Sequence, residues 1–109
     1  MADLRRRGTE PAVLGPVTSK AALVGAFGAA LGFPDWVGAN WDALSDALRD
    51  LSWRPPGPQV VVWVDPGALA RAGAADHGTA LRVLREAAAA SAGTARPLTV
   101  LLVAGPPGD

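Results

Sequence analysis

The sequence predicts an α/β fold in which a small three-stranded parallel sheet packs against about four helices. Strand-like and helix-like apolar patterns alternate in the order strand, two helices, strand, helices, strand. This alternation is typical of parallel strands joined by right-handed helical crossovers. The 109 residues, half of them apolar, are enough for one core. We therefore expect a single domain over residues 12–104, between a flexible arm at 1–11 and a flexible tail at 105–109.

The first predicted elements are a short extended segment at residues 12–14 and a helix that runs to about residue 31. Thr18 or Ser19 is a suitable N-cap, and Gly32 is expected to end the helix. Gly25 and Gly28 each weaken the helix by up to about 1 kcal/mol relative to Ala, so we expect close packing against a neighbour there. The apolar stripe consists of Leu23, Ala26, Phe27, Ala30 and Leu31.

The next predicted helix begins at Asn40, which is a good N-cap, and runs to about Leu51. At about 100° per residue, its apolar and charged side chains separate into two faces. The apolar face consists of Trp41, Leu44, Ala47, Leu48 and Leu51, and the charged face of Asp42, Asp46, Arg49 and Asp50. One face is therefore expected in the core and the other in solvent or against a partner.

The second half of the chain is predicted to contain two more strands. Residues 59–64 and 98–103 are continuous apolar runs, as expected of strands that are buried on both faces. Between them we expect a short helix from Asp65-Pro66 toward Ala72, a loop at 73–78, and a longer helix from Asp76 or Thr79 to Ala90. The inward positions of the longer helix are predicted to be Ala80, Leu81, Leu84, Ala87 and Ala88.

Composition excludes several classes of function. The chain has no Cys, which removes thiol nucleophiles, disulfides and most structural zinc sites. Ten basic residues balance ten acidic ones, so no overall field favours nucleic acid or an anionic membrane. No apolar stretch directly follows the charged residues at the N-terminus, and no run of 18 or more apolar residues that could span a membrane is present. We expect a cytoplasmic protein that needs no cofactor or metal.

The charged face of the helix at 40–51 is unusual. Residues 35–50 contain four Asp and one Arg, which gives this segment a net charge of −3. Asp42 lies in the first turn, where the helix dipole favours it by roughly 0.3 to 1 kcal/mol. Like charges four residues apart cost roughly 0.2 to 0.5 kcal/mol per pair, so Asp46 and Asp50 do not stabilise the helix. The face is either solvated or a recognition surface.

Trp36 lies in a loop between Pro34 and Gly38, outside any amphipathic register that would bury it. Such a residue either fills the core or stays exposed. An exposed tryptophan beside an acidic helix has the composition of a binding hot spot, in which the ring supplies contact area and the charges supply fit. Trp41 and Trp63 occupy inward positions and are predicted in the core, whereas the position of Trp53 is left open.

The segment FPDWVGANWDALSDAL at residues 33–48 resembles the signature segment of the barstar family of intracellular ribonuclease inhibitors. The pattern of Pro, acid, aromatic, Gly, Asn and Asp-Ala-Leu followed by a further Asp is present in full. A weaker resemblance extends over roughly 90 residues, through LRVLREA at 81–87 and the last strand. It implies a barstar-like fold and a partner that is a barnase-like ribonuclease or related nuclease toxin.

The resemblance also implies which residues bind the partner. Asp46 matches the central carboxylate that enters the nuclease site where the substrate phosphate would lie, and Asp42 matches the second acid. Trp36 matches an aromatic ring that covers the catalytic histidine. Val83 and Glu86 match positions at the edge of the contact. The full predicted partner-binding set is Asp35, Trp36, Val37, Gly38, Asn40, Asp42, Ser45, Asp46, Val83 and Glu86.

The chain departs from the family archetype at several positions. Ala39 stands where an acid can occur, Ser45 stands where the archetype has Trp, and the archetypal cysteines are absent. The balanced net charge also differs from the acidic archetype. These departures leave open whether the partner is a nuclease or whether the chain is a generic interaction module of the same fold. We expect the free protein to be a monomer.

Two other classes of function are less favoured by the residues. Asp42 and Asp46 have the chemistry of an acid and base pair, or with Asp35 of a cation site. However, His77 is the only histidine and no catalytic or phosphate-binding motif is present. Nucleic-acid binding through arginines such as Arg5, Arg82 and Arg85 is opposed by the acidic face, which repels phosphates.

Overall fold

The computed structural model describes residues 11–105 and contains one three-stranded sheet and four helices. The strands are β1 (Ala12–Leu14), β2 (Gln59–Val64) and β3 (Leu98–Val103). The helices are α2 (Lys20–Leu31), α3 (Trp41–Asp50), α4 (Gly67–Ala72) and α5 (Ala74–Ser91). The predicted arm and tail lie outside the described residues, except for Pro11 and Gly105. The predicted α/β class with a three-stranded parallel sheet is confirmed.

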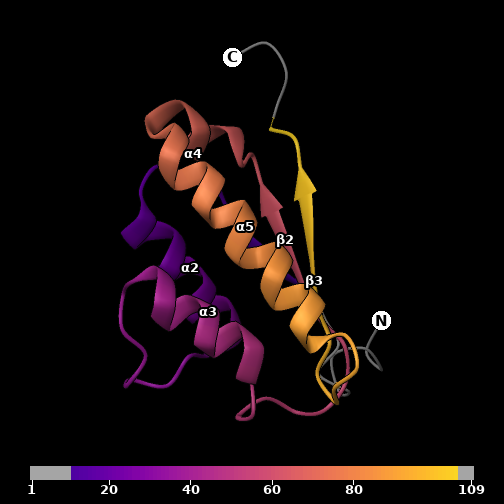
Figure 1. The fold of residues 1–109 in the computed structure, drawn as a ribbon. Helices are drawn as coiled ribbons and strands as arrows, with labels where there is room; N and C mark the ends of the chain where they lie inside the picture. Colours follow the sequence, from indigo (N-terminus) through magenta and orange to yellow (C-terminus); the bar gives the residue numbers. More distant parts are fainter. Residues whose placement is uncertain (1–10, 106–109) are drawn as a thin grey trace.

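The sheet has the order β1-β2-β3, and both pairs of strands are parallel. α2 and α3 connect β1 to β2, while α4 and α5 connect β2 to β3. Because both crossovers step across the sheet in the same direction, one handedness places their helices on the same side. Figure 1 shows α2, α3 and α5 on one side of the sheet.

The core lies between these helices and the sheet. The side chains of Trp63 and Val61 on β2 are fully buried, and the helices contribute Phe27, Leu44 and Leu84 among others. Burying an aliphatic or aromatic side chain stabilises the fold by roughly 1.5 to 3 kcal/mol. Trp63 is in the core as predicted, whereas Trp41 is only partly buried and packs against the edge of the core.

The prediction that β2 and β3 are buried on both faces is wrong. Burial alternates along β2, with Gln59, Val61 and Trp63 buried and the intervening valines only partly buried. On β3, Leu98 is buried but Leu101, Leu102 and Val103 are 45–50% exposed. The physical reason is that the helices cover one face only, and β3 is an edge strand. A continuous apolar run does not reveal which face is covered.

The ends of α2 and α3 agree with the sequence. Ser19 caps α2, and its hydroxyl accepts a hydrogen bond from the backbone N–H of Ala22 at 3.1 Å. Gly32 ends α2 in the left-handed conformation, with φ of 65°, which glycine adopts without steric cost. Asn40 caps α3, as described below, and Leu51 is its C-cap. Gly32 and Asn40 thus mark the start and the end of the loop that carries Trp36.

α5 is longer than predicted. It begins at Ala74, so the expected loop at 73–78 is wrong and His77 lies within the helix. Gly73 is the N-cap, and Asp76 in the first turn interacts favourably with the helix dipole. The predicted inward positions Ala80, Leu84 and Ala87 are buried, whereas Leu81 and Ala88 are only partly buried. Val83 and Ser91 are also buried, which the sequence did not predict. In the described part of the chain, no helix has the length and apolar character needed to cross a membrane.

Candidate protein-binding surface

The loop between α2 and α3 is held by backbone and indole hydrogen bonds. The N–H of Phe33 donates to the carbonyl oxygen of Gly28 at 2.9 Å, and that of Val37 donates to Pro34 at 3.1 Å. The indole Nε1 of Trp53 donates to the carbonyl oxygen of Leu31 at 2.9 Å. This last bond links the segment after α3 to the end of α2. These bonds tie the start of the loop to α2 and brace its first residues.

Trp36 projects from this loop and is 70% exposed. Its ring makes an edge contact with Trp53, with centroids 6.1 Å apart and an interplanar angle of 90°. Trp53 in turn makes an edge contact with Phe33 at 5.8 Å. Edge-to-face pairs of this kind contribute about 0.5 to 1.5 kcal/mol beyond burial. The exposure removes the core-filling alternative, and the contact with Trp53 restricts the orientation of the exposed ring.

The first turn of α3 is organised by Asn40 and Gly38. The Oδ1 atom of Asn40 accepts a hydrogen bond from the backbone N–H of Ala43 at 2.8 Å. The side-chain oxygen of Asn40 is thus committed to capping the helix. A Cβ at Gly38 would lie 3.2 Å from the Nδ2 atom of Asn40, so a larger residue at position 38 would press on the cap. Both residues shape the loop, whatever contact they make with a partner.

Asp35, Asp42 and Asp46 are exposed, and none of them takes part in an ion pair or side-chain hydrogen bond within residues 11–105. We name these carboxylates, together with Trp36, the acidic surface. The nearest base in the sequence, Arg49, is directed elsewhere. Its Nε donates to the hydroxyl of Ser45 at 3.2 Å, and its guanidinium lies 3.9 Å from Glu86.

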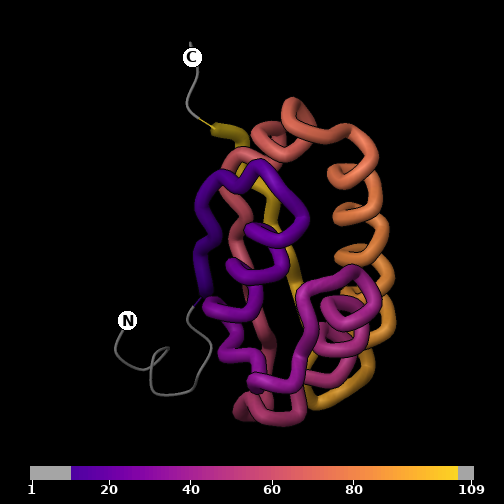
Figure 2. The backbone as a smooth tube through the Cα atoms, turned by 90° about the vertical axis from the view of Figure 1, so that its left-hand side faces the viewer, coloured from indigo at the N-terminus to yellow at the C-terminus, as the bar shows by residue number. Residues whose placement is uncertain are grey.

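α5 supplies the edge of this surface. Figure 2 shows α3 beside the C-terminal half of α5, in agreement with the contact between Arg49 and Glu86. Glu86 also lies 3.7 Å from Arg82, and its side chain is 50% exposed. Val83 is different, because it is only 4% exposed and belongs to the core. We therefore remove Val83 from the predicted partner-binding set, since its side chain does not reach the surface.

The remaining predicted residues lie together. The loop places Val37, partly buried, next to the exposed Trp36, and Ser45 is partly buried under the Arg49 side chain. Two features of the surface were missed by the sequence analysis: the support of Trp36 by Trp53, and the pairing of Arg49 with Glu86. The only sign in the sequence that Trp36 is supported was Trp53, a tryptophan shortly after α3 whose position was left open. The second depends on how α3 and α5 pack.

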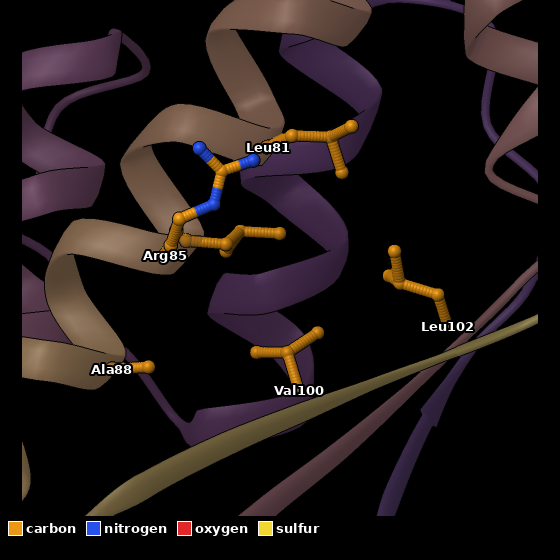
Figure 3. A pocket seen from close by; sticks show the side chains of 6 residues that line it. Leu81, Arg85, Ala88, Val100 and Leu102 are labelled. Atoms are coloured by element: carbon orange, nitrogen blue, oxygen red, sulfur yellow. The ribbon is translucent and has the colours of Figure 1, made fainter.

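A separate hollow of about 260 Å³ lies between α5 and β3 and is lined by Leu81, Leu84, Arg85, Ala88, Val100 and Leu102 (Figure 3). Arg85 is its only charged residue, so it contains no acid and base pair. Within residues 11–105 there is also no group of three or more His, Asp or Glu side chains arranged to hold a metal ion. The acidic surface consists of charges and an aromatic ring displayed on rigid backbone, which is an arrangement suited to binding.

Comparison with known proteins agrees with this description. No curated protein matches the chain significantly. The family described as barstar (barnase inhibitor) matches residues 12–103, which is most of the chain and includes all the helices and strands. The matched region contains the acidic surface and the segment of α5 beside it. The chain therefore belongs to the barstar family.

Proposed function

We propose that this protein inhibits a ribonuclease by inserting the acidic surface into the active site of the enzyme. The observation that carries the proposal is the state of Asp42 and Asp46. Both are exposed, both lie on the same face of α3, and neither has a basic partner in the described part of the chain. The loop that leads into α3 carries a tryptophan, Trp36, that is 70% exposed. Membership of the barstar family supports the same function.

The electrostatic basis is complementarity to a site that binds phosphate. An enzyme that cleaves RNA must surround a phosphodiester with Arg, Lys or His, and these cations bind carboxylates strongly. Short Asp side chains on a helix lose little conformational entropy on binding. The inhibitor therefore occupies the phosphate position with groups that the enzyme cannot cleave. Asp46 is the proposed central carboxylate and Asp42 the second one.

Trp36 is proposed to cover an aromatic or imidazole group of the enzyme. Large rings that are held in place before binding contribute contact area at a low entropic cost, and they are common at hot spots. Trp53 holds the ring of Trp36 by an edge contact and itself packs against Phe33. Glu86 and the backbone of Gly38 and Asn40 are proposed to form the rim of the contact. The inhibitor is proposed to act as a cytoplasmic monomer without a cofactor.

A second candidate function is that of an interaction module whose partner is not a nuclease. Ser45 favours this alternative, because it is small and its hydroxyl is engaged by Arg49, whereas the archetype has a tryptophan there. The zero net charge also gives weaker long-range attraction to a cationic enzyme than an acidic inhibitor would have. On this alternative the acidic surface binds a basic patch that contains no catalytic site.

An inhibition assay distinguishes these functions. RNA hydrolysis is measured for barnase and for the secreted ribonucleases of the source organism, with increasing amounts of the wild-type protein, of Asp46→Asn and of Asp50→Asn. We expect stoichiometric inhibition of at least one enzyme by the wild type and by Asp50→Asn, and much weaker inhibition by Asp46→Asn. Full activity of every enzyme at a large excess of inhibitor would contradict the proposed function.

A further inference from the structure

A hollow of about 240 Å³ lies between α2 and the loop at 33–39, directly beside the acidic surface. One wall is formed by α2 and the other by the loop. The residues that line it are Ala21, Val24, Gly25, Gly28, Phe33, Pro34, Asp35, Val37, Gly38 and Ala39. Small-molecule sites usually measure about 300 to 1,000 Å³. The size of the hollow therefore suits a single side chain.

The two glycines of α2 in this hollow differ in their surroundings. A Cβ at Gly28 would lie 3.4 Å from the ring of Phe33, so this glycine allows close packing, as the sequence predicts. A Cβ at Gly25 would meet no atom within 4 Å, so the predicted close packing is absent there. Glycine is a poor helix former, and the described fold gives no packing reason for it at position 25. Its effect is to leave the floor of the hollow open.

The charges around the hollow favour one kind of occupant. The walls are mainly apolar, and Asp35 is the only charged residue that lines them. Asp35 is exposed and has no ion pair among the described residues. An apolar occupant would remove water from this carboxylate without replacing its hydrogen bonds, which is unfavourable. Lysine and arginine instead combine an apolar stem with a cationic head.

We propose that the hollow between α2 and the loop receives an arginine or lysine side chain of the partner nuclease. The stem lies along Gly25, Gly28 and Phe33, and the cationic head binds the carboxylate of Asp35. This inference rests on the proposed function and extends the interface from α3 and its loop to α2. Gly25 thereby becomes a specificity-determining residue, because any longer side chain at that position occupies the space of the stem.

The test uses Gly25→Leu with Gly78→Leu as a matched control. Gly78 also lies in a helix, and a Cβ there likewise meets no atom within 4 Å. Both variants are therefore expected to fold, which thermal unfolding monitored by circular dichroism verifies. Titration calorimetry with the inhibited nuclease is expected to show at least about a tenfold higher Kd for Gly25→Leu, and a change of less than about threefold for Gly78→Leu.

A double-mutant cycle tests the chemistry of the occupant. Asp35→Asn is expected to raise the Kd by about tenfold, and Gly25→Leu combined with Asp35→Asn is expected to bind about as weakly as Gly25→Leu alone. The reason is that a stem excluded from the hollow cannot bring its head to Asp35. If Gly25→Leu lost affinity and Asp35→Asn did not, the occupant of the hollow would not be a basic side chain. Additive losses would show that the two residues contact different groups.

Failure of this inference is distinguishable from failure of the proposed function. If Asp46→Ala weakens the complex and Gly25→Leu does not, the hollow is empty in the complex and the function stands. If no nuclease is inhibited, the function fails, and the hollow is tested with acetyl-arginine-methylamide as the probe. Saturable shifts of the Gly25 and Gly28 amide resonances that disappear in Gly25→Leu support the hollow as a cation subsite. Absence of those shifts overturns it.

Discussion

The charged side chains at the two ends of α3 differ in their interactions with the rest of the chain. In the last turn, Arg49 forms an ion pair with Glu86, and Asp50 accepts a hydrogen bond from a serine hydroxyl. In the first two turns, Asp42 and Asp46 have no such partner in the described part of the chain. Exposed ion pairs contribute only about 0 to 1 kcal/mol, so neither arrangement decides whether the protein folds. The difference indicates which carboxylates are available to another molecule.

A similar contrast exists between two tryptophans. Trp63 is completely buried in the core, whereas Trp36 is 70% exposed. Replacing a buried tryptophan by alanine costs about 3 to 5 kcal/mol of stability, while replacing an exposed side chain usually changes stability by less than about 0.5 kcal/mol. Trp36 and the exposed carboxylates Asp42 and Asp46 therefore form a surface that contributes little to stability. Binding and folding are therefore expected to respond to different substitutions.

The largest effect is expected for Asp46→Ala. Removal of a carboxylate that is buried against cations in a complex costs about 2 to 5 kcal/mol, or roughly 30-fold to 4,000-fold in Kd. This range of energies includes values for barnase bound to barstar, so it already reflects the behaviour of this family. Calorimetry with the inhibited ribonuclease measures the Kd, and thermal unfolding verifies that stability is unchanged. A loss of less than threefold would show that Asp46 is not the central carboxylate.

Trp36→Ala is expected to weaken binding by about 2 kcal/mol, because the ring is a hot-spot anchor. Its unfolding free energy is expected to fall by no more than about 1.5 kcal/mol, the upper contribution of its edge contact with Trp53. Trp53→Ala is the comparison, since it removes the bond to Leu31 and the ring contacts with Trp36 and Phe33. It is expected to lower both stability and affinity. Equal losses of stability in the two variants would mean that Trp36 is structural.

A smaller effect is expected on the association rate. The segment at 35–50 carries a charge of −3 on a protein of zero net charge, so attraction acts mainly at short range. Stopped-flow measurements between low and moderate salt are expected to show a fall of about tenfold in the wild type. The fall is expected to be much smaller when Asp42 and Asp46 are both replaced by Asn. A rate independent of salt in the wild type would remove the electrostatic contribution.

The smallest effect is expected for Asp50→Ala, the control at the other end of α3. Its carboxylate accepts a hydrogen bond from Ser52 at 3.0 Å and lies one turn beyond Asp46. We expect changes below about 0.5 kcal/mol in both affinity and stability. If Asp50→Ala weakened the complex as much as Asp46→Ala, the whole charged face would bind uniformly. The distinction between the two ends of α3 would then have no functional meaning.

The sequence predicts those features that depend on local chemistry. The caps Ser19 and Asn40 and the helix end at Gly32 appear where the side-chain and backbone preferences place them. The two faces of α3 are also predicted correctly, because its apolar residues keep strict helical spacing. The exposed positions of Asp42 and Asp46 follow from that spacing, whereas that of Asp35 in the loop does not.

Features that depend on packing between elements were not predicted. The apolar runs of β2 and β3 do not show that helices cover only one face of the sheet. In α5, alanine lies on several sides of the helix, so periodicity does not reveal that Val83 is buried in the core while Leu81 packs against it only partly buried. Gly73 and Gly78 indicate a loop, yet Gly78 lies inside α5. The contact of Arg49 with Glu86 joins two helices that are distant in sequence.

The central claim is that carboxylates on α3 occupy the phosphate site of a ribonuclease. The most direct test is the Kd of the complex at increasing concentrations of a 3′-mononucleotide, which binds that phosphate site. We expect the apparent Kd to rise in proportion to the nucleotide concentration, with Asp46→Asn showing a weaker dependence. An apparent Kd that is unchanged at saturating nucleotide would contradict the claim.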